Sequence, residues 1–456
     1  MKNFKVLKKY WNFFFSILII ALLIPLLSES LEKVLVITAI IIVWNILGII
    51  LKDFIKSSFL TLLLILSFNI TYQLPCSVFG IQLADPYVNG IIVNYLIPTI
   101  SILDLGVFLL LISMCSQRKI DLKWKGFSFI KIFLILGIYL IIQSVLKSSF
   151  LSFFNSIRLL LYVFTFYNLL KNLKEIFDKK MYSRILIGSI LLVIFQGILA
   201  LLQFSGGSSV GLSFLGESQV VNGMVGSSFL ELSGALYLRG YGTLPHPNIF
   251  SGWLIFNILL GWYLFDNMQR RRDYSIVLMA ISSIVLILTF SRISFLVCGI
   301  IWLSFVIKVF VNAKNKNFVF LGLISERVLN LFTNGDTSWN DRVNLMRTSL
   351  VMIKENILTG VGLGNFTSSM EENIPRSDKG ILLLQPVHNI FLLIVSEIGL
   401  VGTGLFSTLL YFFFKNRKWS LRFVMCLASI FIIGTFDHYL FSLPQGLGLF
   451  FLLIVI

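Results

Sequence analysis

Long apolar runs recur from one end of this 456-residue chain to the other, and no other feature restricts its fold as strongly. Hydrophobic residues make up 57% of the sequence, Phe alone occurs 44 times, and charged residues contribute only 13%. A water-soluble fold cannot bury that much apolar surface, so we expect a protein that crosses a membrane many times. The runs are too long for barrel strands and do not alternate, which predicts an all-α polytopic membrane protein.

We expect about 12 transmembrane helices, by the length of bilayer that each must cross. The N-terminal run has the basic flank and apolar centre of an export signal but lacks a small-residue cleavage site, so we expect it to be retained as the first helix. The candidate spans are 13–27, 34–51, 57–72, 91–114, 127–146, 151–170, 185–203, 244–265, 275–290, 293–311, 387–413, 420–436 and 439–456.

The positive charge indicates how the chain is oriented. The formal net charge is +16, and the Lys and Arg residues are concentrated in short connections such as 52–56, 117–125, 171–180 and 269–272. Short basic connections face the cytoplasm, so the charge follows from membrane topology and requires no nucleic acid partner. The long segment 204–243 then falls on the outer side, and the basic stretch 415–422 that follows the span 387–413 independently places the end of 312–386 on that side.

The spans and loops divide the chain into five parts. We expect N-terminal transmembrane helices in 1–203, an outer Gly/Ser-rich loop in 204–243, central transmembrane helices in 244–311, a large outer loop with an amphipathic helix in 312–386, and C-terminal transmembrane helices in 387–456. The count of crossings is open at 312–333, whose apolar part is too short to span a bilayer. Either 318–333 enters the membrane partway or the region 275–311 crosses differently.

All three histidines of the chain fall at predicted outer ends of spans. His246 stands in LPHPN, His388 in QPVHN and His438 in FDHYL. Proline and asparagine are favoured where helices begin, so a helix start at the membrane interface would explain these neighbours without any catalytic role. We favour a functional role for His246 and His388, each of which follows a proline and precedes an asparagine, and leave both interpretations open for His438.

Four arginines lie near or beyond the predicted outer face, where the positive-inside bias disfavours them. They are Arg239, Arg292, Arg342 and Arg347. Arg292 is surrounded by apolar residues, a costly position unless the guanidinium meets an anion. Its planar fork of donors suits a diphosphate, which offers two oxygens at once. The alternative is an ion pair with Asp336, Asp341 or Glu231.

Sequence motifs for other chemistries are missing. The stretch GVGLGNF at 360–366 lacks the third glycine of GxGxxG and is better explained as a turn that ends the preceding amphipathic helix, although its amides could still face an anion. The sequence has no HExxH and no DxD in an outer loop, and its four cysteines are scattered. We therefore expect a reaction that uses no metal and no cofactor.

The geometry of a regular helix predicts which side chains lie on the same face as His388. If 388–402 is one regular helix, Glu397 lies about 13.5 Å further along the axis on the opposite face and cannot orient the histidine. Gly399 and Gly402 fall within about 40° of the direction of His388. Small residues on that face permit the close approach of another helix.

These residues resemble the superfamily of O-antigen ligases and polysaccharide polymerases, which are bacterial envelope glycosyltransferases. The stretch from His388-Asn389 to Gly399-Leu-Val-Gly402 fits the family pattern H-[NSQ]-x9-G-x-x-G, and Arg292 to Leu296 fits its R-x3-L element. NDRVNLMRTSLVMIKENILTGVGLGNF resembles the outer-loop helix and turn, and LRGYGTLPHPNIFSG resembles an upstream segment. The four elements occur in the family's order over about 235–405, but the region 312–333 is shorter than the full span that members usually carry there.

The resemblance implies a GT-C-like helical enzyme in the bacterial cytoplasmic membrane with its active site facing outward. Such an enzyme moves a glycan from an undecaprenyl diphosphate carrier to a hydroxyl of a glycan or glycolipid acceptor, with inversion. By position, His388 would be the general base and Arg292 and Arg342 would hold the diphosphate. The remaining site residues implied by the motifs are Arg239, Arg347, His246, Asn248, Asn389, Gly399 and Gly402, with Arg347 able to replace Arg342 in the clamp.

Ligase and polymerase need the same base and the same clamp, so the motifs do not separate them. The alternative from another class is a flippase or exporter of lipid-linked sugars, which would also use outward arginines. A transporter has no need for a histidine above a glycine-rich face and often shows duplicated halves, which this sequence lacks. A non-catalytic envelope protein is the third possibility.

Overall fold

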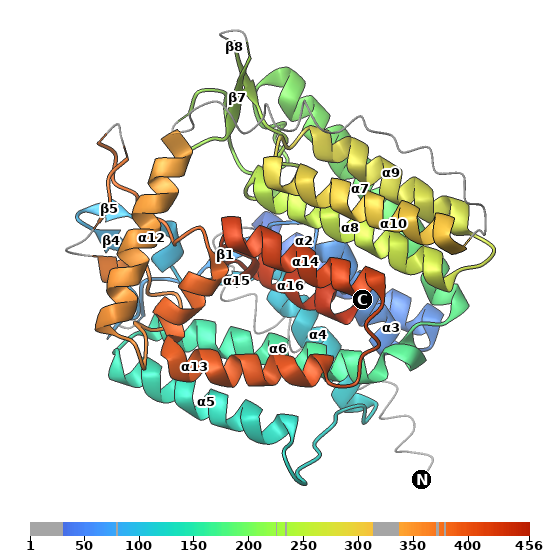
Figure 1. The fold of residues 1–456 in the computed structure, drawn as a ribbon, viewed down its shortest axis with the longest axis horizontal. Coiled ribbons are helices and arrows are strands. Elements are labelled where there is room, and N and C mark those ends of the chain that lie inside the picture. Colours follow the sequence, from blue (N-terminus) through green and yellow to red (C-terminus); the bar gives the residue numbers. More distant parts are fainter. Residues whose placement is uncertain are drawn as a thin grey trace. The chain divides into compact units, whose positions relative to one another are not determined.

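Helices make up most of the computed structural model, which describes residues 31–78, 81–224, 226–232, 235–312, 337–370, 374–377 and 380–456 (Figure 1). This confirms the all-α prediction. The helices are α2 (Leu31–Leu51), α3 (Phe54–Ile65), α4 (Ile102–Ser116), α5 (Phe129–Leu146), α6 (Phe150–Ile176), α7 (Lys179–Gly206), α8 (Pro247–Asn267), α9 (Arg272–Ile287), α10 (Arg292–Asn312), α12 (Thr337–Glu355), α13 (Ile390–Phe414), α14 (Leu421–Phe436), α15 (Tyr439–Ser442) and α16 (Pro444–Val455).

Short strands occur only in connections within the described residues. They form four antiparallel pairs: β1 (Thr71–Gln73) with β6 (Thr99–Ser101), β2 (Ser77–Val78) with β3 (Ile81–Gln82), β4 (Tyr87–Val88) with β5 (Ile91–Ile92), and β7 (Phe229–Leu232) with β8 (Ala235–Leu238). Three 3-10 turns complete the structure at Asn94–Leu96, Ser213–Leu215 and Ser368–Met370.

Seven helices in the described part of the chain are long and apolar enough to cross a membrane. They are Val34–Leu51 of α2, α5, α6, α7, α8, Arg292–Phe310 of α10, and α13. Four shorter apolar helices, α3, α4, α14 and α16, coincide with further predicted spans. The predicted span 13–27 lies outside the described residues, and so does the stretch 318–333, for which partial entry into the membrane was one of two alternatives.

Local signals delay the start of one expected span and interrupt another. The expected span 91–114 becomes a helix only at Ile102, since Ser101 and Asp104 form a capping box and the preceding residues pair as strand β6. The expected span 439–456 is interrupted before Pro444, which cannot continue a helix from the previous turn and instead starts α16.

The chain separates into two compact units that are described individually. One contains 1–73, 99–121 and 164–250, and the other contains 74–98, 122–163 and 251–456. In the first, α2, α3 and α4 pack against one another, and α7 packs against α3. Ser58 links the first three helices there, because its hydroxyl accepts from Trp44 Nε1 at 2.7 Å and lies 2.8 Å from Ser113 Oγ.

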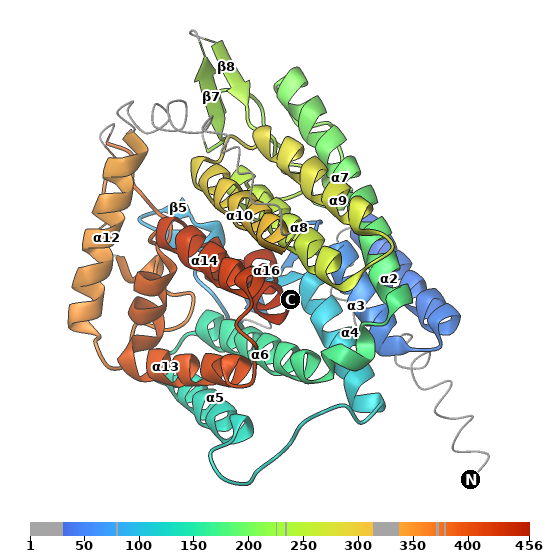
Figure 2. The same ribbon diagram turned by 45° about the vertical axis from the view of Figure 1, so that its right-hand side comes forward.

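In the second unit, α13 packs along α5 and also contacts α12 and α14 (Figure 2). The amphipathic helix predicted within 312–386 is present as α12. Its apolar side joins a buried cluster with the segment before α13, which includes Leu345, Met352, Val361 and Val387.

Polar contacts mark the two ends of α14 in this unit. Asp266 near the end of α8 pairs with Lys308 of α10 at 2.6 Å and lies 3.5 Å from Arg422 at the start of α14. At the other end of α14, the Asn389 amide donates to the carbonyl of Thr435 at 3.2 Å. The start of α13 therefore lies at the opposite end of α14 from the basic cluster around Asp266.

Candidate catalytic site

His388 lies just before helix α13 and not within it. Asn389 is the N-cap, and its side chain accepts hydrogen bonds of 3.0 Å from the amides of Phe391 and Leu392. The same Asn389 side chain donates to Thr435, so it fixes the start of α13 against the end of α14. These bonds hold His388, the neighbour of Asn389, at the junction between α13 and α14.

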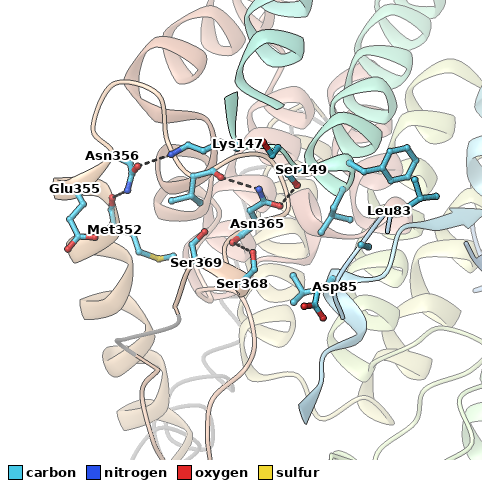
Figure 3. A pocket seen from close by; sticks show the side chains of 16 residues that line it. Leu83, Asp85, Lys147, Ser149, Met352, Glu355, Asn356, Asn365, Ser368 and Ser369 are labelled. Atoms are coloured by element: carbon cyan, nitrogen blue, oxygen red, sulfur yellow. Dashed lines mark hydrogen bonds between the residues drawn. The ribbon is translucent and has the colours of Figure 1, made fainter. Parts of the chain in front are cut away.

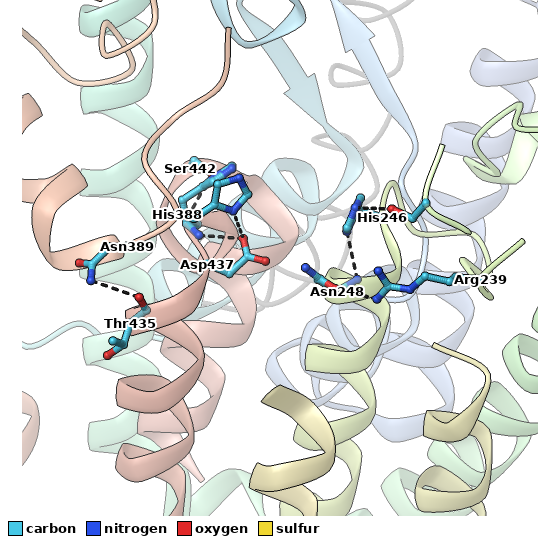
Figure 4. A network of polar contacts seen from close by, with 10 residues as sticks. Arg239, His246, Asn248, His388, Asn389, Thr435, Asp437 and Ser442 are labelled. Atoms are coloured by element: carbon cyan, nitrogen blue, oxygen red, sulfur yellow. Dashed lines mark hydrogen bonds and ion pairs between the residues drawn. The ribbon is translucent and has the colours of Figure 1, made fainter. Parts of the chain in front are cut away.

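The end of α14 brings a carboxylate to His388. Asp437 follows the helix in an extended conformation, and its Oδ1 lies 3.8 Å from Nδ1 of His388 (Figure 4). Oδ1 also accepts from the backbone amide of His438 at 2.8 Å, which orients the carboxylate. The rings of His388 and His438 meet edge to face with centroids 5.0 Å apart.

This arrangement favours one tautomer of His388. Nδ1 is buried and has no hydrogen-bond partner in the structure, while its nearest acceptor is the Asp437 carboxylate. A carboxylate on that side stabilises a proton on Nδ1 and leaves the lone pair on Nε2. If Nδ1 of His388 and Oδ1 of Asp437 moved from 3.8 Å to hydrogen-bond distance, the carboxylate would orient the imidazole. General bases in enzymes are often held by a carboxylate in this way.

Asp437 was not among the predicted site residues. It is separated from His388 by the whole of α13 and α14, so only the folded chain brings them together. The signal in the sequence was the adjacent pair Asp437-His438 at the outer end of an apolar run, in a protein with few charged residues.

The assumption that 388–402 forms one regular helix is wrong. Gly399 has φ 63° and ψ −178°, a conformation that is accessible almost only to glycine, and α13 is kinked there. Angles counted from His388 across this point therefore do not describe the real directions. The inference that Glu397 is not the partner of His388 still agrees with its contacts, because the Glu397 carboxylate accepts from the amides of Gly364 and Phe366.

The kink of α13 exchanges backbone hydrogen bonds with the glycine-rich turn that follows α12. Two helix carbonyls accept from the turn, and two helix amides donate to the residues just before it. The four bonds are Val361 N to Ser396 O at 2.9 Å, Gly362 N to Glu397 O at 2.8 Å, Leu400 N to Ile357 O at 2.9 Å, and Val401 N to Leu358 O at 3.3 Å. The break in the helix therefore leaves these backbone groups paired, as a lipid environment requires.

Glycine is required on both sides of this exchange. A Cβ on Gly399 would stand 2.3 Å from the Leu358 carbonyl oxygen, and one on Gly360, which has φ 69°, would stand 2.4 Å from the Glu397 carbonyl oxygen. Gly402 packs against the ring of Tyr139 of α5. Another helix was expected to approach both glycines; the neighbour of Gly402 is a side chain of α5, whereas the neighbour of Gly399 is the segment Leu358–Thr359 before the turn and not a helix. Within GVGLGNF, the amides of Gly364 and Phe366 donate to the buried carboxyl group of Glu397.

The predicted clamp arginines occupy different elements. Arg292 begins α10 and is half-buried, directly after Ser291, whose hydroxyl donates to Ser294 at 3.0 Å. Arg342 and Arg347 both lie on α12, five residues and therefore about 140° apart around the helix. Arg342 is half-buried and Arg347 is exposed. The two arginine side chains therefore face different directions around α12.

His246 is held by hydrogen bonds on both ring nitrogens. Nδ1 accepts from the amide of Asn248 at 3.1 Å near the start of α8, so the neutral ring carries its proton on Nε2, which lies 2.8 Å from Ser228 Oγ. Asn248 in turn accepts from the Arg239 guanidinium at 2.9 Å (Figure 4). The three predicted residues Arg239, His246 and Asn248 thus form one network that belongs to the first unit.

A polar cavity of about 430 Å³ lies in the second unit between the α5–α6 connection, the end of α12 and the segment 83–96 (Figure 3). Its polar lining includes Asp85, Lys147, Ser149, Glu355, Asn356 and Asn365. Some of these groups are paired, for example Lys147 with Asn356 at 3.0 Å. Acceptors and donors of this kind can bind a molecule rich in hydroxyls, and none of the residues predicted for the site lines this cavity.

Comparison with known proteins identifies one family. Residues 251–407 match a family model described as O-antigen ligase, and no curated protein gives a match. The match confirms the resemblance that the motifs indicated. It covers about a third of the chain and includes Arg292, Arg342 and His388, whereas Asp437 and the Arg239 network lie outside it.

Proposed function

Starting from the membership of residues 251–407 in the O-antigen ligase family, we propose that this membrane protein transfers a glycan from an undecaprenyl diphosphate carrier to a hydroxyl of a glycan or glycolipid acceptor. The family indicates ligase or polymerase activity in the building of the bacterial envelope. The observation that carries the specific reaction is the pairing of His388 with Asp437 at the end of α14, which supplies a base of the correct kind.

In the proposed reaction His388 acts as the general base. Its Nε2 removes the proton of the acceptor hydroxyl as that oxygen attacks the anomeric carbon of the donor sugar. The new glycosidic bond forms while the bond from the anomeric carbon to the diphosphate oxygen breaks, and the configuration is inverted. The diphosphate leaves with the electron pair and needs no proton when its charge is held by cations.

We assign the diphosphate to Arg292 and Arg342. Both are half-buried, and both lie in segments where the positive-inside bias disfavours arginine. A guanidinium removed from bulk water interacts strongly with a diphosphate, because its donors match two oxygens at once. The charge of the leaving group increases in the transition state, so these contacts strengthen as the bond breaks.

We further propose that the reaction takes place at the outer face of the cytoplasmic membrane. The basic residues Lys308 and Arg422 lie together with Asp266, and His388 lies at the other end of α14. If the basic connections face the cytoplasm, His388 faces outward. Donor glycans carried on the outer leaflet and acceptors on that side then reach the same site.

The test is a transfer assay with purified protein in nanodiscs, a defined undecaprenyl-diphosphate glycan and separate acceptors. We expect His388→Ala to lower the transfer rate by about 10²–10⁴-fold, the usual contribution of a general base, while the affinity for the donor is unchanged. Rates equal to those of the native protein would refute the base assignment. A ladder of products would indicate a polymerase, and a single addition to a different acceptor would indicate a ligase.

A further inference from the structure

His388, Asp437 and His438 together have the composition and the spacing of a metal-binding site. One potential ligand atom from each of the three side chains lies within 4.8 Å of the other two. His438 is buried, the side chains of Asp437 and His388 are 13% and 18% exposed, and Nδ1 of His388 is a buried atom without a hydrogen-bond partner. We propose that these residues bind a divalent transition metal ion of the Zn²⁺ type, and that the bound ion switches off the base.

The ligand set selects the class of metal. Two imidazole nitrogens and one carboxylate oxygen suit Zn²⁺, Co²⁺, Ni²⁺ or Cu²⁺, whereas Mg²⁺ and Ca²⁺ prefer oxygen ligands. Three protein ligands with a fourth position for water is a common arrangement for zinc. The three atoms must approach by about an ångström to reach the ligand spacing of a tetrahedral ion, which small side-chain rotations can supply.

His438 is already oriented for ligation. Its Nδ1 lies 2.6 Å from Ser442 Oγ, and the Ser442 hydroxyl donates to the carbonyl of His438 at 3.2 Å. Because the single proton of the Ser442 hydroxyl is donated to that carbonyl, the hydroxyl oxygen acts as acceptor toward Nδ1 of His438. Nδ1 then carries the ring proton, and the lone pair of the imidazole is on Nε2. Hydrogen bonding of the second nitrogen to a neighbouring side chain is typical of metal-ligating histidines. Asp437 is fixed in the same way by the His438 amide at 2.8 Å.

A metal ion bound at this site would change the protonation of His388. A neutral imidazole has one lone pair, so a metal bound at either ring nitrogen leaves a proton on the other. The ring can then no longer accept a proton from a sugar hydroxyl. The inhibitory part of the inference rests on the proposed function, but the metal site itself does not.

Binding is tested without any transfer assay. We titrate the full chain in nanodiscs with Co²⁺, whose visible absorption reports nitrogen and oxygen ligation, and repeat the titration by calorimetry with Zn²⁺. We expect one ion per chain, and we expect both His438→Gln and Asp437→Asn to weaken binding by at least about tenfold. His246→Gln is the matched control, because this histidine belongs to the Arg239 network. The affinity of this variant for the metal ion should equal that of the native protein.

Two outcomes would overturn the site: no Co²⁺ bound by the native chain, or equal affinity in both site variants. If His438→Gln fails to fold, the metal affinity of Asp437→Asn decides the question, because the Asn side chain has nearly the same shape as Asp. The inhibition is tested separately with an active preparation, where Zn²⁺ should abolish transfer and a chelator should restore it. Binding without inhibition would leave the site in place and overturn only the switch, while an inactive protein that binds Co²⁺ would count against the proposed function alone.

Discussion

At the scale of single residues, the chemistry depends on Asp437, a neighbour that motif analysis did not supply. His388 and Asn389 are adjacent and occur in a recognisable pattern, so the sequence sufficed to single them out. Asp437 is brought to His388 by the hydrogen bond between Asn389 and Thr435 at 3.2 Å. A contact of that kind depends on how two helices pack, and no local pattern contains it.

Replacing Asp437 by Asn should separate orientation from binding. The amide keeps the shape of the side chain but removes the charge that stabilises the proton on Nδ1 of His388. We expect kcat to fall by about 10–100-fold with little change in the KM of either substrate, and Asp437→Glu to recover part of the loss. Steady-state kinetics with defined donor and acceptor measure both values. A change in KM alone would mean that Asp437 binds substrate and does not orient the base.

A second residue-scale prediction concerns pH and lies far from the site. The ammonium of Lys56, 2.5 Å away, and then the Met181 amide hold the pKa of Asp178 below its ordinary value. A lowered pKa in the folded state means that the stabilisation is present above the unfolded pKa of about 3.9 and is lost as pH falls through the folded value.

The variant that tests this is Asp178→Asn, which retains an N-cap for α7 but removes the charge. Asp178 is half-exposed, so we expect a loss of less than about 1 kcal/mol at pH 7 and none once the pH is below the folded pKa. Thermal unfolding of the native and variant proteins in detergent at several pH values gives the difference. A difference that persists at the lowest pH would assign the effect to the cap.

At the scale of elements, the exchange of hydrogen bonds between α13 and the turn after α12 is the most demanding feature. The sequence predicted the turn, the following helix and the small residues at Gly399 and Gly402. It did not predict the kink, because the apolar run of α13 has the length and composition of an uninterrupted span. The Glu397 carboxylate, buried within that run, is explained by the turn amides of Gly364 and Phe366 that it accepts from.

Gly399→Ala tests this element directly. The new Cβ would meet the Leu358 carbonyl oxygen at 2.3 Å, and the residue would be held in a backbone conformation disfavoured for alanine. We expect a loss of about 2–5 kcal/mol of folding stability from strain and crowding together. Gly404→Ala is the matched control on the same helix, because no atom lies within 4 Å of its added Cβ. Equal thermal stability of the two variants would contradict the account of the kink.

At the scale of the whole molecule, composition and charge predicted the class of fold and an order of helices that agrees with the described residues. The ends of the helices were less predictable, because Ser101 and Pro444 start helices inside apolar stretches. A hydropathy average over many residues does not detect single capping residues of this kind. The small strand pairs around Tyr72, Val88 and Leu230 were missed because they occupy connections without alternating patterns of useful length.

Orientation in the membrane is a whole-molecule prediction. Ser377 lies in the segment before α13, on the side assigned to the outer face, and Asn416 lies exposed in the basic connection between α13 and α14. In a chain whose four cysteines have been replaced, we expect a membrane-impermeant thiol reagent to label Ser377→Cys in intact cells. Asn416→Cys should react only after the membrane is opened. The reverse labelling would place His388 in the cytoplasm and exclude an outer-leaflet donor.

The interlocked turn and kink also limit how the protein can be recombined. Four backbone bonds join residues 357–362 to 396–401, so these two stretches form one unit although about 35 residues separate them. A chimera that exchanges the outer segment with a relative by crossing over between Phe366 and Asn389 would combine a turn from one parent with a bent helix from the other. Grafting of acceptor specificity is therefore best attempted with both stretches transferred together.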